Sequence, residues 1–206
     1  QYDYVVRRMK EAGLDDRVEV LLTDFRDIEG DFDRVISIEM IESIDEEAWV
    51  DLYSVISRSL VPGGTAALQV ITIDHDLHLQ MIGREEFIRA YIFPGGALPS
   101  TKILRRLGDD AGLEWIGLST HGTSYARTLQ AWDERFVAAW PTIAGQSDRF
   151  DERFYRMWRY YLVASEIGFT HLANEVFQIQ LTRHQEAAPL TRDYMLGPTN
   201  FQKFVG

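Results

Sequence analysis

Two glutamates of this sequence lie in strongly apolar surroundings. Glu39 and Glu42 belong to the segment VISIEMIESID, residues 35–45, where isoleucine and methionine are their neighbours. A carboxylate in such surroundings is costly unless another group pairs with it. If the chain becomes helical directly after the preceding strand, a spacing of three residues directs both side chains into one crevice. The functional interpretation is a carboxylate that orients a base or a cation, and the alternative is the acidic first turn of a helix.

Polar segments follow three predicted strands, at residues 23–27, 39–43 and 69–76. In open α/β sheets, ligands bind at the carboxyl ends of the strands. Asp24 could accept hydrogen bonds from an exocyclic amine such as that of adenine, and Phe25 could stack on the ring. The alternative is an ordinary turn with an Asx hydrogen bond, and the residues alone favour this alternative.

Histidines and aromatic residues form two further patterns. His75 and His78 could suggest a metal site, but no third ligand is nearby, so we predict no metal. Aromatic side chains recur at helical spacing from Tyr125 to Tyr161, which most simply indicates a hydrophobic core. The alternatives are the wall of an acyl-chain tunnel, or rings that stabilise a cation.

The elements that position these side chains follow from hydrophobic periodicity. The apolar run at 34–38 is typical of a parallel strand covered on both faces. The order of elements predicts an α/β fold with a doubly wound, mostly parallel sheet, and an irregular tail from His184. The predicted helices are 2–12, 45–60 and a long aromatic-rich stretch from 125 to 161; the predicted strands are 18–22, 34–38, 65–73, 113–120 and 175–183.

Composition limits the classes of partner. The chain has 206 residues and a net charge of −11, which argues against a nucleic-acid binder. The charge also disfavours broad adsorption to anionic lipid, although the basic cluster of Lys102, Arg105 and Arg106 could contact lipid headgroups. The chain contains no cysteine, which fits a cytoplasmic location, and no apolar run long enough to span a membrane. The first residues read as a helix already under way, so we expect an upstream portion.

Five motifs together resemble the cyclopropane-fatty-acid synthase family of S-adenosylmethionine-dependent methyltransferases. They are FDRVISIEMIESI, LVPGGTAALQVITI, YIFPGGALPS, SYARTLQAWDERF and YYLVASEIGF. The resemblance runs from Gln1 to about Arg183, and the wording IEMIE and LQVIT is similar to the actinobacterial branch that methylates oleoyl chains. It implies a class I methyltransferase (Rossmann-like) domain at 1–183 with a helical lid at about 77–168, followed by the irregular tail 184–206.

The resemblance also implies a binding site for S-adenosylmethionine. The family's glycine-rich cofactor loop and an active-site cysteine would lie upstream of Gln1. Six residues match the family's cofactor contacts: for the ribose Gln1, for the adenine Asp24, Phe25 and Arg26, and for the methionine portion Ile38 and Glu39.

The family's general base is a bound bicarbonate, and its ligands have counterparts here. Glu42 matches the glutamate that holds the anion, Tyr125 matches a tyrosine that assists, and the main chain of Ile71 would contribute. Two positions depart from the family pattern. Gln69 stands where the family usually has a histidine, and Ser43 stands where many members have a second one. Gln69 can still donate and accept hydrogen bonds, so anion binding is retained.

The implied reaction adds a methyl group to the double bond of an unsaturated phospholipid acyl chain and gives a 10-methylene product. The resemblance further implies a peripheral location at the inner membrane surface, a flavin-dependent reductase as partner, and a homodimer. Three alternatives remain open. They are a cyclopropane synthase, a small-molecule N- or O-methyltransferase in which Glu42 is itself the base, and a non-catalytic scaffold.

Overall fold

The computed structural model describes residues 1–84, 87–171 and 173–183. The chain divides into two compact units, 1–30 and 31–206, which are described separately below. The predicted tail 184–206 lies outside the described residues.

The first unit contains one α-helix and one short 3-10 helix. Helix α1 spans Tyr2–Glu11, which confirms the predicted helix, and the chain leaves it through Gly13 at a φ of +65°. The 3-10 helix η1 spans Phe25–Asp27. The predicted strand at 18–22 is wrong, because a strand needs a backbone partner and no described residue pairs with this segment. Its residues Leu21 and Leu22 are largely exposed.

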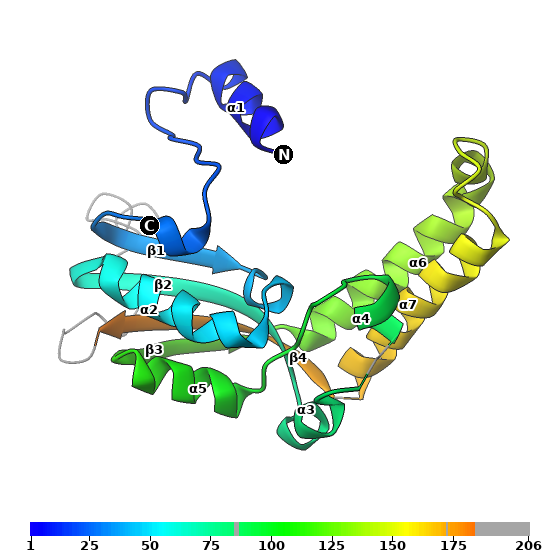
Figure 1. Cartoon of the computed structure of the whole chain (residues 1–206). Coiled ribbons are helices and arrows are strands. Elements are labelled where there is room, and N and C mark those ends of the chain that lie inside the picture. The colour runs from blue at the N-terminus through cyan, green and yellow to red at the C-terminus, as the bar shows by residue number, and fades with distance from the viewer. Residues whose placement is uncertain (85–86, 172, 184–206) are drawn as a thin grey trace, which may run out of the picture. The chain divides into compact units, whose positions relative to one another are not determined.

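The second unit is built on a four-stranded sheet of order β1-β2-β4-β3 (Figure 1). Strand β1 pairs in parallel with β2, whereas β4 pairs antiparallel with both β2 and β3. Three strands therefore run in one direction and β4 runs the opposite way between two of them, which confirms the predicted α/β class. The strands are β1 Phe32–Ile38, β2 Leu60–Ile73, β3 Leu113–Thr120 and β4 Asn174–Arg183.

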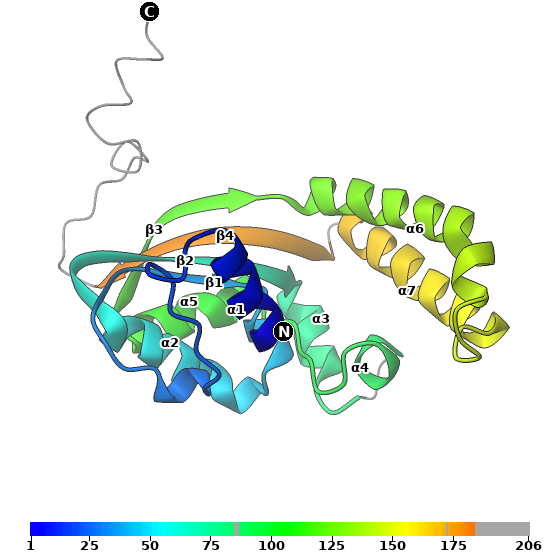
Figure 2. The same ribbon diagram turned by 90° about the horizontal axis from the view of Figure 1, so that it is seen from above.

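Two helices cover one face of this sheet. Helix α2 spans Trp49–Ser59 and follows the 3-10 helix η3 at Glu46–Ala48; α5 spans Thr101–Asp110. Both helices lie along the same face, as Figure 2 shows, and they bury Tyr53, Ile56 and Leu104 almost completely. The predicted amphipathic helix at 45–60 is confirmed. The VPGG segment that follows this helix belongs to β2.

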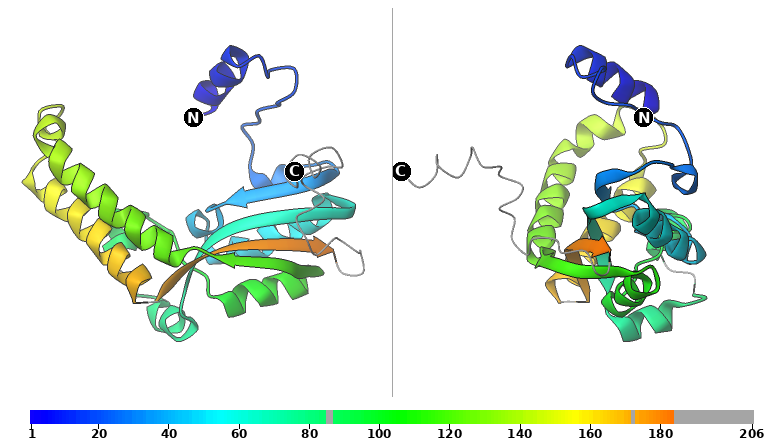
Figure 3. Two further views of the ribbon diagram at one scale, coloured as in Figure 1. Left: turned by 180° about the vertical axis from the view of Figure 1, so that it is seen from behind. Right: turned by 90° about the vertical axis from the view of Figure 1, so that its left-hand side faces the viewer.

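The opposite face of β1 is exposed within the second unit, as the left view of Figure 3 shows. Ile36 is 70% exposed and Ile38 is 60% exposed. Within the second unit, this strand is therefore covered on one face and not on both as predicted. The reason is that β1 lies at an edge of the sheet and only the α2 and α5 face carries helices there.

Helices α6, Gly122–Ala144, and α7, Glu152–Thr170, form a long pair that extends from the end of the sheet where β1 and β2 terminate (Figure 1). Its aromatic side chains pack between the two helices, as in the stacked rings of Phe136 and Tyr155 at 5.7 Å. Arg159 also bonds Asp133 through both carboxylate oxygens at 2.8 Å. The base of the pair buries Leu129, Leu162 and Phe169 against Val176 of β4.

The predicted helical lid at about 77–168 is not continuous. It contains the short helices α3, His75–Met81, and α4, Phe87–Tyr91, together with α6 and most of α7. It also contains α5 and β3, which belong to the sheet layer. Hydrophobic periodicity assigns element type but does not assign an element to a layer, which explains this difference.

Candidate active site

The backbone around Glu42 is held from two sides. Directly after β1, the 3-10 helix η2, Ile41–Ser43, carries Glu42 in its centre. The Trp49 indole N–H donates to the Ile41 carbonyl at 2.9 Å, and the Ala97 N–H donates to the Glu42 carbonyl at 3.1 Å. Ile41 itself is 1% exposed. The side chain of Glu42 therefore leaves a fixed turn at the carboxyl end of β1.

Only one of the two oxygens of the Glu42 carboxyl group has a hydrogen-bond partner among the described residues. Its Oε1 accepts the Ile71 backbone N–H at 2.6 Å, whereas its buried Oε2 has no hydrogen-bond partner among the described residues. Burial raises the pKa of Glu42 to about 7. The hydrogen bond from the Ile71 N–H lowers this pKa, and the charge of Glu39 raises it by a smaller amount. Near neutral pH this carboxyl group can therefore either hold a proton or release it.

Glu39 is the one described non-glycine residue with a positive φ, at +50°. This left-handed conformation is uncommon for a residue with a side chain and is found at functional sites. The Glu39 N–H continues the sheet by donating to the Gln69 carbonyl at 2.9 Å. Its carboxylate Oε1 accepts from the Tyr125 hydroxyl and from Gln69 Nε2, the latter at 2.9 Å.

Tyr125 links the helical pair to the sheet. Its hydroxyl donates to Glu39 and accepts from Gln69 Nε2 at 2.8 Å. Burial, then the hydrogen bond and charge of Glu39, raise the pKa of Tyr125 above its ordinary value, so the hydroxyl remains a donor. The Tyr125 ring packs on Phe169 at 5.4 Å between ring centres. Burial and the charge of Glu39 also raise the pKa of Tyr161.

The structure brings together all four predicted catalytic residues, Glu42, Gln69, Ile71 and Tyr125, and adds Glu39. The Ile71 N–H, predicted to contact the anion, is bonded to Glu42 and so positions this glutamate. Glu39, matched by resemblance to the cofactor, is bonded to Tyr125 and Gln69.

One residue of this cluster is absent from the sequence predictions. Gln178 of β4 donates through Nε2 to Gln69 Oε1 at 2.9 Å. The signal that could have found it is the glutamine pair Gln178 and Gln180, which alternates with the apolar residues Phe177, Ile179 and Leu181 along β4.

The other predicted cofactor residues lie in β1 and in the first unit. Ile38 pairs with Gln69 in the β1–β2 ladder and is largely exposed. In the first unit, Gln1 caps α1, and Asp24 accepts both the Arg26 backbone N–H and the Arg26 guanidinium at 2.8 to 2.9 Å. The Asx hydrogen bond of the alternative interpretation is therefore present, and the hydrogen bonds from Arg26 lower the pKa of Asp24 to about 2. The Arg26 guanidinium also lies 5.7 Å from the Phe25 ring centre.

The two histidines of α3 are bound to protein groups. His75 Nδ1 lies 2.7 Å from Ser100 Oγ, and His78 Nδ1 lies 3.0 Å from the Leu98 carbonyl oxygen. The described residues contain no group of three or more His, Cys, Asp or Glu that could hold a metal ion.

A groove of about 530 Å³ lies beside these histidines, between α2, α3 and α5. Among its lining residues are exposed Val50, Leu79 and Ile82 together with the cations Lys102 and Arg106. The third predicted basic residue, Arg105, instead stacks on Trp115 at 4.2 Å.

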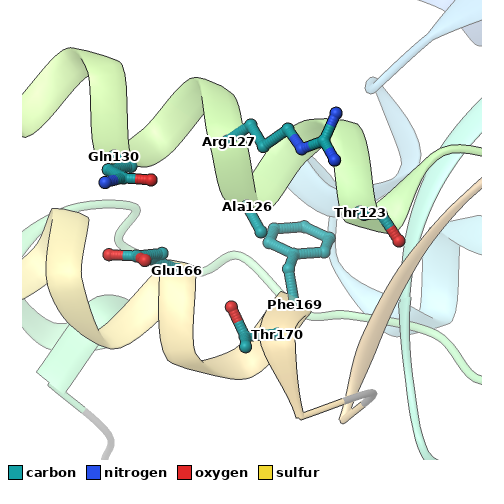
Figure 4. Close-up of a pocket in the computed structure, with 7 residues that line it drawn as sticks. All are labelled: Thr123, Ala126, Arg127, Gln130, Glu166, Phe169 and Thr170. Carbon is teal, nitrogen blue, oxygen red and sulfur yellow. The ribbon is translucent and has the colours of Figure 1, made fainter.

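A smaller hollow of about 240 Å³ lies between α6 and α7, and Figure 4 shows the residues that line it. Its rim carries Arg127 and Gln130 from α6 and Glu166 from α7, and Phe169 lies between the helices. This mixed polar lining does not resemble an apolar tunnel for an acyl chain. No helix among the described residues combines the length and the apolar character needed to cross a bilayer.

Comparison with known proteins identifies the family of this chain. The chain matches the family described as "Mycolic acid cyclopropane synthetase" over residues 1–179. It is 39% identical to "Tuberculostearic acid methyltransferase UfaA1" of Mycobacterium tuberculosis, across 86% of this chain and 41% of that protein. It is 36% identical to "Cyclopropane-fatty-acyl-phospholipid synthase" of Escherichia coli K12, across 84% of this chain and 43% of that protein. The chain thus spans about two fifths of the length of these relatives.

Solved structures share the fold. The cyclopropane synthase MmaA2 from Mycobacterium tuberculosis superposes with a TM-score of 0.68 at 23% identity, covering 84% of this chain and 66% of that one. The mycolic acid cyclopropane synthase CmaA1, complexed with SAH and CTAB, superposes with a TM-score of 0.70 at 23% identity, covering 87% and 65%. These likenesses confirm the class I methyltransferase fold.

Proposed function

Because this chain belongs to the mycolic acid cyclopropane synthetase family, we propose that it carries the catalytic site of an S-adenosylmethionine-dependent C-methyltransferase. The substrate is the double bond of an unsaturated fatty acyl chain of a phospholipid, and the product is a 10-methylene acyl chain. The observation that carries this proposal is the buried, unpaired Oε2 of Glu42 beside the Glu39–Gln69–Tyr125 cluster.

The residues around Glu42 fit a small anion such as bicarbonate. A buried carboxyl oxygen without a partner needs a hydrogen-bonding group, and a carboxyl group with a pKa of about 7 can share a proton with an anion. Two full negative charges in one pocket repel each other, so the shared proton is required. Glu42 would hold bicarbonate, which supplies a proton acceptor when bound. Tyr125 and Gln69 would assist as donors by exchanging their present hydrogen bonds to Glu39 for bonds to the anion.

Gln1, Asp24, Phe25, Arg26, Ile38 and Glu39 are proposed to bind S-adenosylmethionine, which supplies an electrophilic methyl group. In the first unit, the exposed Asp24 carboxylate and the half-buried Phe25 ring lie beside Arg26. These groups could meet the donors and the flat face of an adenine. The remaining two, Ile38 and Glu39, lie where β1 ends, which is the edge of an α/β sheet where ligands bind.

The proposed reaction sets three requirements for this chain. The alkene gains a methyl group on one carbon and becomes a cation on its neighbour, so water must be kept out. The face of an aromatic ring attracts such a cation. Two rings lie near Glu39: Tyr125, which donates a hydrogen bond to it, and Tyr161, whose pKa its charge raises. Glu42 must keep the proton acceptor oriented until a proton leaves the substrate carbon. A hydride shift before proton loss gives the methylene, and direct loss from the new methyl group closes a cyclopropane.

The choice of a methylene product rests on the relative named tuberculostearic acid methyltransferase and on the wording IEMIE and LQVIT. The cyclopropane synthase of Escherichia coli, at 36% identity, favours the second candidate product. The two candidates use the same residues and differ only in the fate of the cation.

The finer proposals concern the setting of the enzyme. We expect a cytoplasmic protein that associates peripherally with the inner membrane surface, because its substrate is a membrane lipid. A methylene product requires a reductant to become a methyl branch, so a flavin-dependent reductase is the expected partner. The family resemblance also implies a homodimer, and we expect the intact protein to form one.

Product analysis tests the proposed function directly. The intact protein is incubated with oleoyl phospholipid and S-adenosylmethionine, and the acyl chains are compared with standards by mass spectrometry. We expect the 10-methylene chain. A cyclopropane chain would assign the second candidate, and methylation of only small nitrogen or oxygen acceptors would overturn the lipid assignment.

Glu42→Gln tests the role of the central carboxyl group. The amide is nearly isosteric and can still accept the Ile71 N–H, so folding and cofactor binding should persist. It cannot exchange a proton with an anion, and loss of general-base function costs about a hundred- to ten-thousandfold in rate. The measurement is kcat beside a thermal melt, with Glu47→Gln as a control that removes a nearby exposed carboxylate. Near-normal kcat in Glu42→Gln would remove Glu42 from the mechanism.

A further inference from the structure

A row of polar side chains crosses the sheet beside the candidate active site. Ser119 of β3 pairs with Gln178 of β4, and Gln178 pairs with Gln69 of β2. Gln69 pairs with Ile38, directly before Glu39. Residues directly opposite each other on neighbouring strands project from the same face. The row therefore leads along one face of the sheet to the active-site cluster.

The hydrogen bonds along this row have one consistent direction. Ser119 Oγ donates to Gln178 Oε1 at 3.5 Å, and Gln178 Nε2 donates to Gln69 Oε1 at 2.9 Å. Gln69 Nε2 then donates to Glu39 Oε1 at 2.9 Å and to the Tyr125 hydroxyl at 2.8 Å. The amide oxygens of Gln178 and Gln69 face away from the cluster, and their N–H₂ groups face towards it.

A glutamine amide has a donor end and an acceptor end, and half a turn about its last side-chain bond exchanges them. In the opposite orientation, the Gln69 oxygen would face the Glu39 carboxylate, and two N–H₂ groups would face each other at Gln178. The first contact is unfavourable because neither oxygen carries a proton to donate. The second contact is unfavourable because neither N–H₂ group offers an acceptor. The N–H₂ of Gln178 therefore selects the orientation of Gln69.

The orientation of Gln69 in turn decides where the Tyr125 proton points. Because the Tyr125 oxygen accepts from Gln69 Nε2, its single proton is directed to Glu39. If Gln69 were rotated, its oxygen would attract that proton instead. Glu39 would then lose both of its described donors.

From this geometry we propose that Gln178 is a positioning residue, which keeps the Gln69 N–H₂ directed into the active site and thereby fixes the Tyr125 hydroxyl. The proposal rests on the proposed function, because it assigns Gln178 to the same cluster.

A purely structural role for Gln178 makes a different prediction. A cross-strand pair on an exposed face contributes to sheet stability, and its loss would lower the melting temperature without selecting between donor and acceptor replacements. The test must therefore compare a replacement that donates to Gln69 with one that only accepts, and must control for the charge that each one adds.

Gln178→Lys and Gln178→Glu provide this comparison in the intact protein. The lysine ammonium can still donate to Gln69 Oε1, so kcat should stay close to that of the unsubstituted enzyme. The glutamate accepts only, so the Gln69 amide loses the donor that fixes its orientation, and kcat should fall by about ten- to hundredfold, the range known for partners that orient metal ligands. The KM values for both substrates should change much less. Gln180→Lys and Gln180→Glu, two residues along the same strand, add the same charges and serve as the controls.

A second measurement does not require activity. In protein labelled with ¹⁵N in its glutamine side chains, the Gln69 N–H₂ protons should show nuclear Overhauser contacts to the Tyr125 ring. We expect these contacts in the unsubstituted protein and in Gln178→Lys, and their loss in Gln178→Glu. Equal kcat in the two variants, or contacts unchanged in Gln178→Glu, would overturn the positioning role. Absence of lipid methylation by the unsubstituted protein would instead overturn the proposed function, and the nuclear Overhauser comparison would still decide on Gln178.

Discussion

At the scale of single residues, the site is defined by carboxyl groups whose surroundings differ. Glu39 accepts two hydrogen bonds from side chains, whereas Glu42 accepts one backbone N–H and leaves its second oxygen buried and unpaired. Burial dominates at Glu42 and raises its pKa to about 7. Differences of this kind between neighbouring carboxyl groups mark sites where one is arranged to handle a proton.

This shift makes folding stability depend on pH. The folded protein holds the Glu42 proton more tightly than the unfolded chain, whose glutamate has the ordinary pKa of 4.5. The stabilisation that this proton gives is complete below about pH 4.5. It falls as the pH rises towards 7 and is lost above about pH 7. Between about pH 5 and 8 the unsubstituted protein should lose about 2 to 3 kcal/mol relative to Glu42→Gln.

Urea denaturation of both proteins in bicarbonate-free buffer measures this difference, because all other titrating groups are shared and cancel. Parallel pH profiles for the two proteins would show that Glu42 ionises normally in the folded state. Added bicarbonate binds only the folded site in the proposed function, so it should reduce the difference.

At the scale of elements, the segment after α4 holds the turn that carries Glu42. Gly96 lies so close that an added Cβ would come within 2.9 Å of the Glu42 carbonyl oxygen and 3.1 Å of the Phe93 carbonyl oxygen. Both neighbours are backbone atoms, which cannot rotate away as a side chain can. The YIFPGGALPS motif therefore has a structural reason for glycine at this position.

Gly96→Ala should displace Glu42 and weaken the hydrogen bond from Ala97. We expect a loss of about 1 to 3 kcal/mol of stability, as for other overpacked sites, together with reduced kcat. Gly145→Ala is the matched control, because its nearest neighbour would lie 3.7 Å away in ordinary contact. The readouts are a chemical melt and kcat. A Gly96→Ala protein that matches the control in both would show that the turn tolerates the side chain.

At the scale of the whole molecule, the net charge of −11 opposes general adsorption to an anionic membrane. At physiological salt, charges farther apart than about 8 Å are largely screened, so a local surface can still bind lipid. The groove between α2, α3 and α5 combines exposed apolar side chains with Lys102 and Arg106, and its anionic lining residue is Glu46. It is the described surface that best fits the proposed membrane contact.

Replacing Lys102 and Arg106 together by alanine should weaken binding of the intact protein to phosphatidylglycerol vesicles by about 2 kcal/mol, at about 1 kcal/mol for each basic residue near the surface. Sedimentation with vesicles at physiological salt measures this change. Arg153→Ala with Arg156→Ala removes the same charge from α7 and is the control. An equal loss in both double variants would point to net charge alone, and no loss in either would place the membrane contact elsewhere.

The sequence by itself determined the identity of most elements. Periodicity located α1, α2 and the four described strands, because alternation and helical spacing are local properties of the chain. The motif resemblance named Glu42, Gln69, Ile71 and Tyr125 as one set; in the structure Glu42 accepts from Ile71, and Gln69 donates to Tyr125. The strand expected at 18–22 was wrong, since strand pairing depends on distant residues.

Only the tertiary structure decided how the cluster is connected. Gln178 lies 109 residues from Gln69 in the sequence, and Tyr125 lies 86 residues from Glu39. Their contacts arise because β4 runs between β2 and β3, an order that no alternation of apolar residues encodes. The raised pKa of Glu42 likewise comes from burial by segments far along the chain. Residue types could suggest the chemistry, but the strand order set which donor faces which acceptor.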